Sequence, residues 1–158
     1  MWQRLTTIRI RASTDAVFAL LAEIELWPAI FPHVHSARVL RRDGVRRLVA
    51  VQARWRRLPL GWRAVQTLDR ARGHISIRHL SPLTAGSVAT FDLSPTRDAD
   101  GQDAVDLTFR QDVVVSLPVV GTYLARQFVG GLVAREQGEA LLARLKYVAE
   151  GGSLAGRS

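Results

Sequence analysis

Residues 17–32 read VFALLAEIELWPAIFP, and this stretch decides the fold. Its first half carries apolar residues at helical spacing, and the preceding Ser13 or Thr14 can cap a helix. Its second half contains Pro28 and Pro32, which interrupt a regular helix. The stretch therefore predicts one helix that ends in a short helical corner.

Strand-like segments lie on both sides of this stretch. Residues 5–11 alternate polar and apolar side chains before the helix, and six further segments with the same period of two follow the corner. Asp43-Gly44 is a strong signal for a tight hairpin between two of them. Such regular alternation is typical of an antiparallel sheet with one buried and one wet face. The six segments cover residues 34–42, 47–57, 60–70, 74–80, 87–94 and 105–113.

Beyond Pro118 the period becomes helical, and apolar residues share one side of the chain from Val120 to Val148. A helix of that length is about 45 Å long and crosses a small domain. The order of elements predicts an α+β fold, in which a curved antiparallel sheet of about seven strands wraps around a long C-terminal helix. Because one helix fills the concave side incompletely, we expect a hydrophobic ligand cavity there.

The composition is that of one globular domain. The chain has 158 residues, 47% of them hydrophobic, and no cysteine, which excludes disulfides, thiol catalysis and cysteine-ligated metals. Residues 1–150 are predicted to form the domain, and residues 151–158, rich in Gly and Ser, a flexible tail. We see neither a signal peptide nor a transmembrane segment and expect a cytoplasmic protein.

Positive charge is concentrated in one third of the chain. The formal net charge is +8, and twelve arginines between Arg38 and Arg78 are accompanied by only two acids, Asp43 and Asp69. Strand alternation places most of these arginines on the wet face, where they can attract an acidic partner. Few aromatic residues interleave with them, which disfavours nucleic acid. An anionic membrane surface, an acidic carrier protein and a simply solvated surface all stay open.

The segment Ile24-Glu25-Leu26-Trp27-Pro28-Ala29-Ile30-Phe31 resembles the helical corner of the START/Bet v 1-like superfamily, within its polyketide cyclase/dehydrase and lipid-transport group. The similarity continues in residues 37–40 and 140–146, and the element order agrees over residues 3–150. The resemblance implies a helix-grip fold with a deep apolar cavity for a polyketide, quinone or lipid-like molecule. Members include aromatase/cyclases that act on polyketide chains tethered to acyl carrier protein.

The aromatase/cyclases that this chain resembles line the cavity with the tryptophan of the corner, which matches Trp27. They also use an arginine on a cavity-facing strand, here in the region of Trp62 to Leu68. Arg63 is the arginine of this strand, but alternation places it on the wet face, opposite Trp62. The sequence therefore favours a ligand binder, with cyclase activity, a non-catalytic lipid or quinone carrier, and a regulatory module as functions to be distinguished.

Polar residues on otherwise apolar inward faces mark the candidate chemistry, because a buried polar group requires a partner. His79 is the best candidate for proton transfer, since its ordinary pKa lies near neutrality. The candidate catalytic residues are His79, Gln66 and Tyr123. The candidate ligand-binding residues, which could equally form an ordinary core, are Trp27, Phe31, Trp55, Trp62, Phe91, Phe109, Gln111, Tyr123, Gln127 and Phe128.

Cofactor and metal signals are weak. His33 and His35 could present two imidazoles on one side of a strand, but no third ligand follows at a suitable spacing, so we expect no metal site. The sequence contains no Walker loop, no dinucleotide-binding glycine pattern and no G-x-S-x-G turn, and we expect no cofactor. The expected partners are a hydrophobic small molecule and, at the arginine-rich outer face, acyl carrier protein or another acidic partner.

Overall fold

A computed structural model describes residues 2–55, 58–81, 84–114 and 135–152. Its elements follow the predicted order of a strand, a helix, a short helical corner, six strands and a C-terminal helix. They are β1 (Trp2–Ile10), α1 (Thr14–Ala22), the 3-10 turn η1 (Ile24–Leu26), α2 (Trp27–Ile30), β2 (Val34–Asp43), β3 (Arg46–Trp55), β4 (Leu58–Asp69), β5 (His74–His79), β6 (Val88–Arg97), β7 (Asp103–Val113) and α4 (Arg135–Ala149). The predicted α+β class is confirmed.

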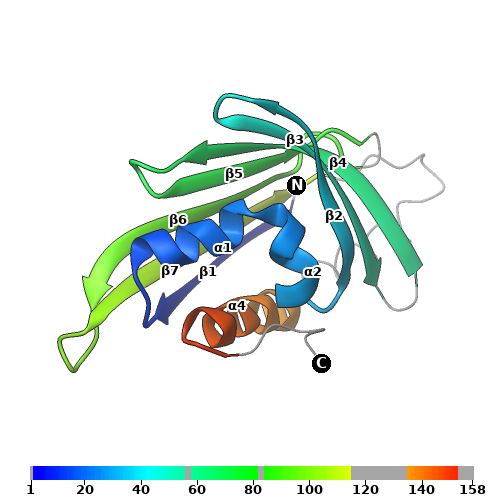
Figure 1. Cartoon of the computed structure of the whole chain (residues 1–158). Helices are drawn as coiled ribbons and strands as arrows, with labels where there is room; N and C mark the ends of the chain where they lie inside the picture. The colour runs from blue at the N-terminus through cyan, green and yellow to red at the C-terminus, as the bar shows by residue number, and fades with distance from the viewer. Residues whose placement is uncertain (1, 56–57, 82–83, 115–134, 153–158) are drawn as a thin grey trace.

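The seven strands form one antiparallel sheet in the order β1-β7-β6-β5-β4-β3-β2. Figure 1 shows that the sheet curves and that α1, α2 and α4 lie on its concave side. The edge strand β2 carries two register shifts against β3, between Val34 and Ser36 and between Val39 and Arg41. Because bulges bend a strand and increase its twist, they help this edge to curl toward the helices.

Local sequence explains the ends of these elements. Ser13 caps α1 by accepting a hydrogen bond from the backbone N–H of Ala16 at 3.2 Å, as predicted. Asp15 lies in the first turn, where the helix dipole favours a carboxylate. The hairpin between β2 and β3 turns at Gly44, whose φ of 58° is a conformation that glycine adopts without strain. The predicted Asp43-Gly44 turn is therefore confirmed.

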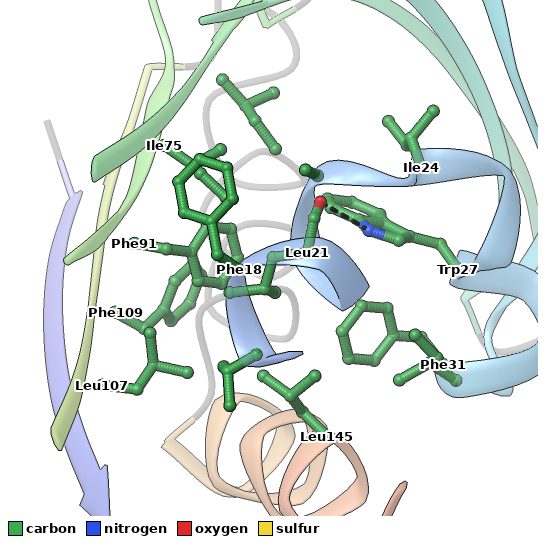
Figure 2. Packing of buried hydrophobic residues seen from close by; sticks show 14 of the residues in the cluster. Phe18, Leu21, Ile24, Trp27, Phe31, Ile75, Phe91, Leu107, Phe109 and Leu145 are labelled. Carbon is green, nitrogen blue, oxygen red and sulfur yellow. Dashed lines mark hydrogen bonds between the residues drawn. The ribbon is translucent and has the colours of Figure 1, made fainter. Parts of the chain in front are cut away.

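The core lies between the concave face of the sheet and the helices. Helix α1 contributes Phe18 and Leu21, which are buried together with Leu145 of α4. Beneath them, Phe91 of β6 stacks on Phe109 of β7 with ring centroids 4.9 Å apart. Figure 2 shows these side chains pointing toward one another from the sheet, α1 and α4.

The C-terminal helix is described only in part. The predicted helix runs from Val120 to Val148, and α4 gives its second half, in which Leu142, Leu145 and Val148 are buried. Residues 120–134 of that prediction, and most of the predicted tail, lie outside the described residues. Within the part of the chain that the structure describes, no helix is long and apolar enough to span a membrane.

Candidate functional site

Three side chains converge on the C-terminal end of α1, where helix carbonyl groups have no partner within the helix. The indole Nε1–H of Trp27 donates to the carbonyl oxygen of Leu21 at 3.2 Å, as the dashed line in Figure 2 shows. The amide Nε2 of Gln66 donates to the carbonyl oxygens of Leu21 and Ala22, at 3.3 Å each. A guanidinium nitrogen of Arg47 donates to the carbonyl oxygen of Ala22 at 3.1 Å. The corner is thus fastened to β3 and β4 through the end of α1.

This geometry gives Gln66 a structural role. Its amide group has two N–H donors, and the two carbonyl oxygens of α1 use both. The side chain is fully buried, and its Oε1 has no hydrogen-bond partner and no contact with solvent. A residue held in this way offers no donor to a ligand. The helix end that it caps explains the buried polar group of Gln66, and its catalytic role stays a prediction.

Most of the predicted aromatic ligand-binding residues with a described side chain are packed in the core. Phe31 is 2% exposed and makes an edge-to-face contact with Trp27, with centroids 5.4 Å apart. Phe91 and Phe109, stacked on each other, are buried as well. The ordinary-core interpretation therefore describes these four side chains. Tyr123, Gln127 and Phe128, together with the side chain of Trp55, lie outside what the structure describes.

A second group of inward-facing residues is only half-buried. Trp62 of β4 and His79 of β5 stack in parallel, with ring centroids 5.5 Å apart and an angle of 9° between the planes. The two strands pair so that His79 lies opposite Ala64, next to Trp62 on the same face. The stack presents a flat aromatic surface, and both rings keep some exposure. Among the predicted site residues whose ring side chains the structure describes, Trp62 and His79 are the two that are not fully buried.

Burial lowers the pKa of His79 to about 4, so its imidazole is neutral at pH 7. Its Nδ1 lies 3.1 Å from the hydroxyl oxygen of Thr84. When the Thr84 hydroxyl donates to Nδ1, the ring proton is on Nε2. Within the described residues Nε2 has no hydrogen-bond partner. A neutral imidazole with a free N–H can donate to a carbonyl oxygen.

One row across the concave face carries further polar groups. The register of the sheet aligns Gln66, Ile77, Ala89, Gln111 and Arg4 on five neighbouring strands. Gln111 is half-buried, while Arg4 is 8% exposed. Directly opposed side chains on one face of a sheet are about 5 Å apart. Arg4 and Gln111 are therefore neighbouring polar residues on the concave face.

Arg4 is a residue that the sequence analysis missed. Arg63 is exposed on the convex face, as predicted, whereas Arg4 on β1 is buried on the concave face. The signal was present in the sequence, because Arg4 lies four and six residues before Ile8 and Ile10. Alternation puts residues of equal parity on the same face of a strand. Extending the first strand by one residue would have placed Arg4 with them.

His33 and His35 are both exposed at the start of β2. Among the described residues there is no group of three or more His, Cys, Asp or Glu side chains that could hold a metal ion.

Comparisons with solved structures support the fold. The aromatase/cyclase ZhuI from Streptomyces sp. R1128 superposes with a TM-score of 0.82 over 96% of this chain and 98% of its own, at 22% identity. A START superfamily protein from Mycobacterium smegmatis superposes with a TM-score of 0.70 over 94% and 97%, at 18% identity. At these identities the likeness concerns the fold alone.

Sequence comparisons identify the family as well as the fold. The bifunctional cyclase/dehydratase of the granaticin polyketide synthase from Streptomyces violaceoruber is 31% identical over 106 residues, or 66% of this chain. The chain spans about a third, 32%, of that relative. The model of the family described as polyketide cyclase / dehydrase and lipid transport matches residues 1–150. With this match the START/Bet v 1-like resemblance of the Trp27-Pro28 corner is confirmed, and the chain belongs to the polyketide cyclase/dehydrase and lipid transport family.

Proposed function

We propose that the chain binds a poly-β-ketone or the polycyclic product formed from it between the sheet and the C-terminal helix, and that it promotes aldol cyclisation and dehydration there. The observation that carries the proposal is the stack of Trp62 and His79. It combines a flat aromatic surface with a neutral imidazole whose Nε2 has no hydrogen-bond partner among the described residues. We also keep two predictions, that the substrate arrives on an acyl carrier protein and that the reaction takes place in the cytoplasm.

The chemistry requires stabilised oxygen anions and no redox partner. In an aldol cyclisation, a CH₂ group between two carbonyls loses a proton, and its carbon bonds to a second carbonyl carbon of the same chain. The oxygen of that carbonyl takes up a proton. Dehydration then breaks its C–O bond and an adjacent C–H bond, which releases water and leaves a C=C bond. Negative charge develops on a carbonyl oxygen at each stage, and a preorganised hydrogen-bond donor stabilises it.

His79 fits the role of such a donor better than that of a general base. A general base is most effective when its pKa lies near the working pH, whereas burial lowers the pKa of His79 to about 4. The neutral ring donates through Nε2 in the tautomer in which Nδ1 accepts from the Thr84 hydroxyl. The Arg4–Gln111 pair supplies a second polar group on the same face. We propose that these residues polarise carbonyl groups of a chain whose planar part lies against Trp62.

The test compares His79→Phe with His74→Gln. Both histidines belong to β5, but His74 lies on the convex face, where it pairs with Asp92 at 2.6 Å. His79→Phe keeps an aromatic ring beside Trp62 and removes the donor. We expect it to retain binding of the aromatic product and to lower kcat for a carrier-free poly-β-ketone thioester by about 100-fold, a typical cost of losing one such donor. His74→Gln should change neither. Unchanged kcat in His79→Phe would refute the catalytic role.

The alternative is a non-catalytic carrier of a quinone or lipid-like molecule. Arg63 supports it, because the arginine of β4 faces away from the helices. A carrier would bind such ligands tightly and show no turnover of any poly-β-ketone. In that case His79→Phe would alter affinity only. The same pair of measurements therefore separates the two functions.

A further inference from the structure

The convex face of the sheet has two halves that differ in whether their charged side chains form ion pairs. On the half formed by β5, β6, β7 and β1, opposite charges neutralise one another. Arg9 lies 2.8 Å from Asp106, and Arg110 lies 3.3 Å from Asp112. The carboxylates belong to β7 and the arginines to β1 and β7. This half presents a mixed, self-paired surface.

The half formed by β2, β3, β4 and the end of β5 is different. Its convex face carries six exposed arginines, and within the described residues none of them has a carboxylate within 4.0 Å. A patch of one sign that is not neutralised by its neighbours creates a long-range potential for an opposite charge. The six are Arg38, Arg41, Arg46, Arg54, Arg63 and Arg78.

A groove lies within this basic half. It has a volume of about 330 Å³, and its lining includes His35, Gln52, Arg54, Pro59 and Gly61. Gly61 contributes no side chain to the convex face. A Cβ at this position would meet only the carbonyl oxygen of Val51 at 3.9 Å and the Cγ of Gln52 at 4.0 Å. The space over Gly61 is therefore open.

Strand pairing places arginines on both sides of this groove. Gln52 is paired with Gly61, and the adjacent pair along β3 and β4 on the same face is Arg54 with Pro59. In the other direction, Ala50 lies between Arg38 of β2 and Arg63 of β4. Residues two apart on a strand are separated by about 7 Å. The floor formed by Gln52 and Gly61 is thus flanked by Arg54 on one side and by Arg38 and Arg63 on the other.

We propose that this groove, defined by Gln52, Arg54, Pro59, Gly61 and the flanking Arg38 and Arg63, is a docking site for an acidic segment of the acyl carrier protein. The identity of the partner rests on the function proposed above, whereas the location rests on charge and shape. Guanidinium groups bind carboxylates in a bidentate manner, and a groove between rows of them selects an acidic helix or loop over a diffuse anion.

A protein fits this surface better than the other polyanions. Single-stranded nucleic acid requires aromatic side chains for stacking, and the described lining of the groove contains none apart from the imidazole of His35. An anionic membrane favours a flat basic surface, whereas here the arginines surround a hollow. The sheet curves (Figure 1), and Gln52, Arg54 and Gly61 of the groove belong to its convex face, which curves away from an approaching bilayer.

The experiment measures the affinity of a fluorescently labelled acyl carrier protein from an aromatic polyketide pathway by anisotropy. Arg54→Gln/Arg63→Gln is compared with Arg9→Gln/Arg110→Gln, which removes the same charge from the self-paired half. We expect the first to weaken binding at least tenfold and the second less than twofold. Gly61→Thr keeps the net charge, favours a strand and fills the groove. It should weaken binding severalfold, which diffuse attraction would not predict.

Other outcomes overturn the docking site. These are no binding of the carrier protein, an equal effect of the two double variants, or an unaffected Gly61→Thr. Tighter groove-dependent binding of a 20-base-pair DNA or of phosphatidylserine vesicles would overturn the choice of partner. Binding of the carrier-free aromatic product to the concave side is measured in parallel. If the product still binds, and the affinity for the acyl carrier protein does not depend on the groove residues, only the docking site fails. If carrier binding depends on the groove while His79→Phe keeps full kcat, only the catalytic proposal fails.

Discussion

The two ends of the concave face are built from the same strands and differ in what covers them. At the closed end, defined by Ile75, Phe91, Leu107 and Phe109, the sheet is covered by apolar side chains of α1 and α4. At the open end, defined by Trp62, His79, Ala89 and Gln111, the inward side chains stay half-buried. Gln66 lies between them and ties the end of α1 to the sheet. We therefore expect an inward polar residue to serve the fold at the closed end and a ligand at the open end.

The closed end should show the largest loss of stability. Phe91→Ala removes a 3% exposed ring that stacks on Phe109, and the helices above cannot fully collapse into the space. We expect the free energy of unfolding to fall by about 3–5 kcal/mol, measured by urea denaturation. Phe91→Leu, which keeps most of the volume, should lose clearly less. A loss under about 1 kcal/mol for Phe91→Ala would contradict a packed closed end.

The second-largest expected effect is a loss of stability in acid, caused by His79 at the open end. The pKa of His79 is lowered from 6.5 to about 4 in the folded protein, so the unfolded chain binds more protons between these pH values. Stability is therefore full above pH 6.5 and falls as the pH drops toward 4, by at most about 1.4 kcal/mol per pH unit.

The measurement is the free energy of unfolding at pH 7, 6, 5 and 4 in the wild type and in two single variants. His79→Gln should flatten the profile between pH 6.5 and 4, because glutamine does not titrate. His74→Gln, on the convex face of the same strand, leaves the contribution of His79 in place. Equal profiles for His79→Gln and the wild type would show that the ring of His79 is not held neutral by burial.

The sequence predicted the fold more completely than the site. Alternation and the Trp27-Pro28 corner gave the seven strands, the helices and the outward direction of Arg63, because these depend on local patterns. The role of Gln66 could not be predicted, since its two acceptors are carbonyl oxygens about 45 residues earlier in the chain. The sequence also could not show which aromatic residues are buried and which are half-buried, because burial depends on where α1 crosses the sheet. Phe91 and Trp62 follow the same pattern but occupy different ends.

Gln66 lies between the two ends, and its substitution should cause a smaller loss of stability than that of Phe91. Gln66→Leu removes both donors from the end of α1, although Trp27 and Arg47 still donate to the same carbonyl oxygens. We expect a loss of about 1–2 kcal/mol by urea denaturation. Gln66→Glu should cost more, because it turns an oxygen toward acceptor oxygens. Turnover per folded molecule should stay within twofold in Gln66→Leu. A large loss of kcat with unchanged stability would instead support a catalytic role for Gln66.

Trp62→Leu should have the smallest effect on stability and the most informative one on the site. The indole is half-buried, and its stacking on His79 contributes about 0.5–1.5 kcal/mol beyond the area that it buries. Its removal opens His79 to water, and because burial alone causes the low pKa, the pKa should rise from about 4 toward 6.5. NMR titration of the imidazole ring protons measures this directly. Affinity for the aromatic product should fall, whereas Phe91→Leu leaves the surface of the stack intact. If Trp62→Leu were as destabilising as Phe91→Ala and left the pKa of His79 unchanged, the two ends would be one continuous core, and the ligand would have to bind elsewhere.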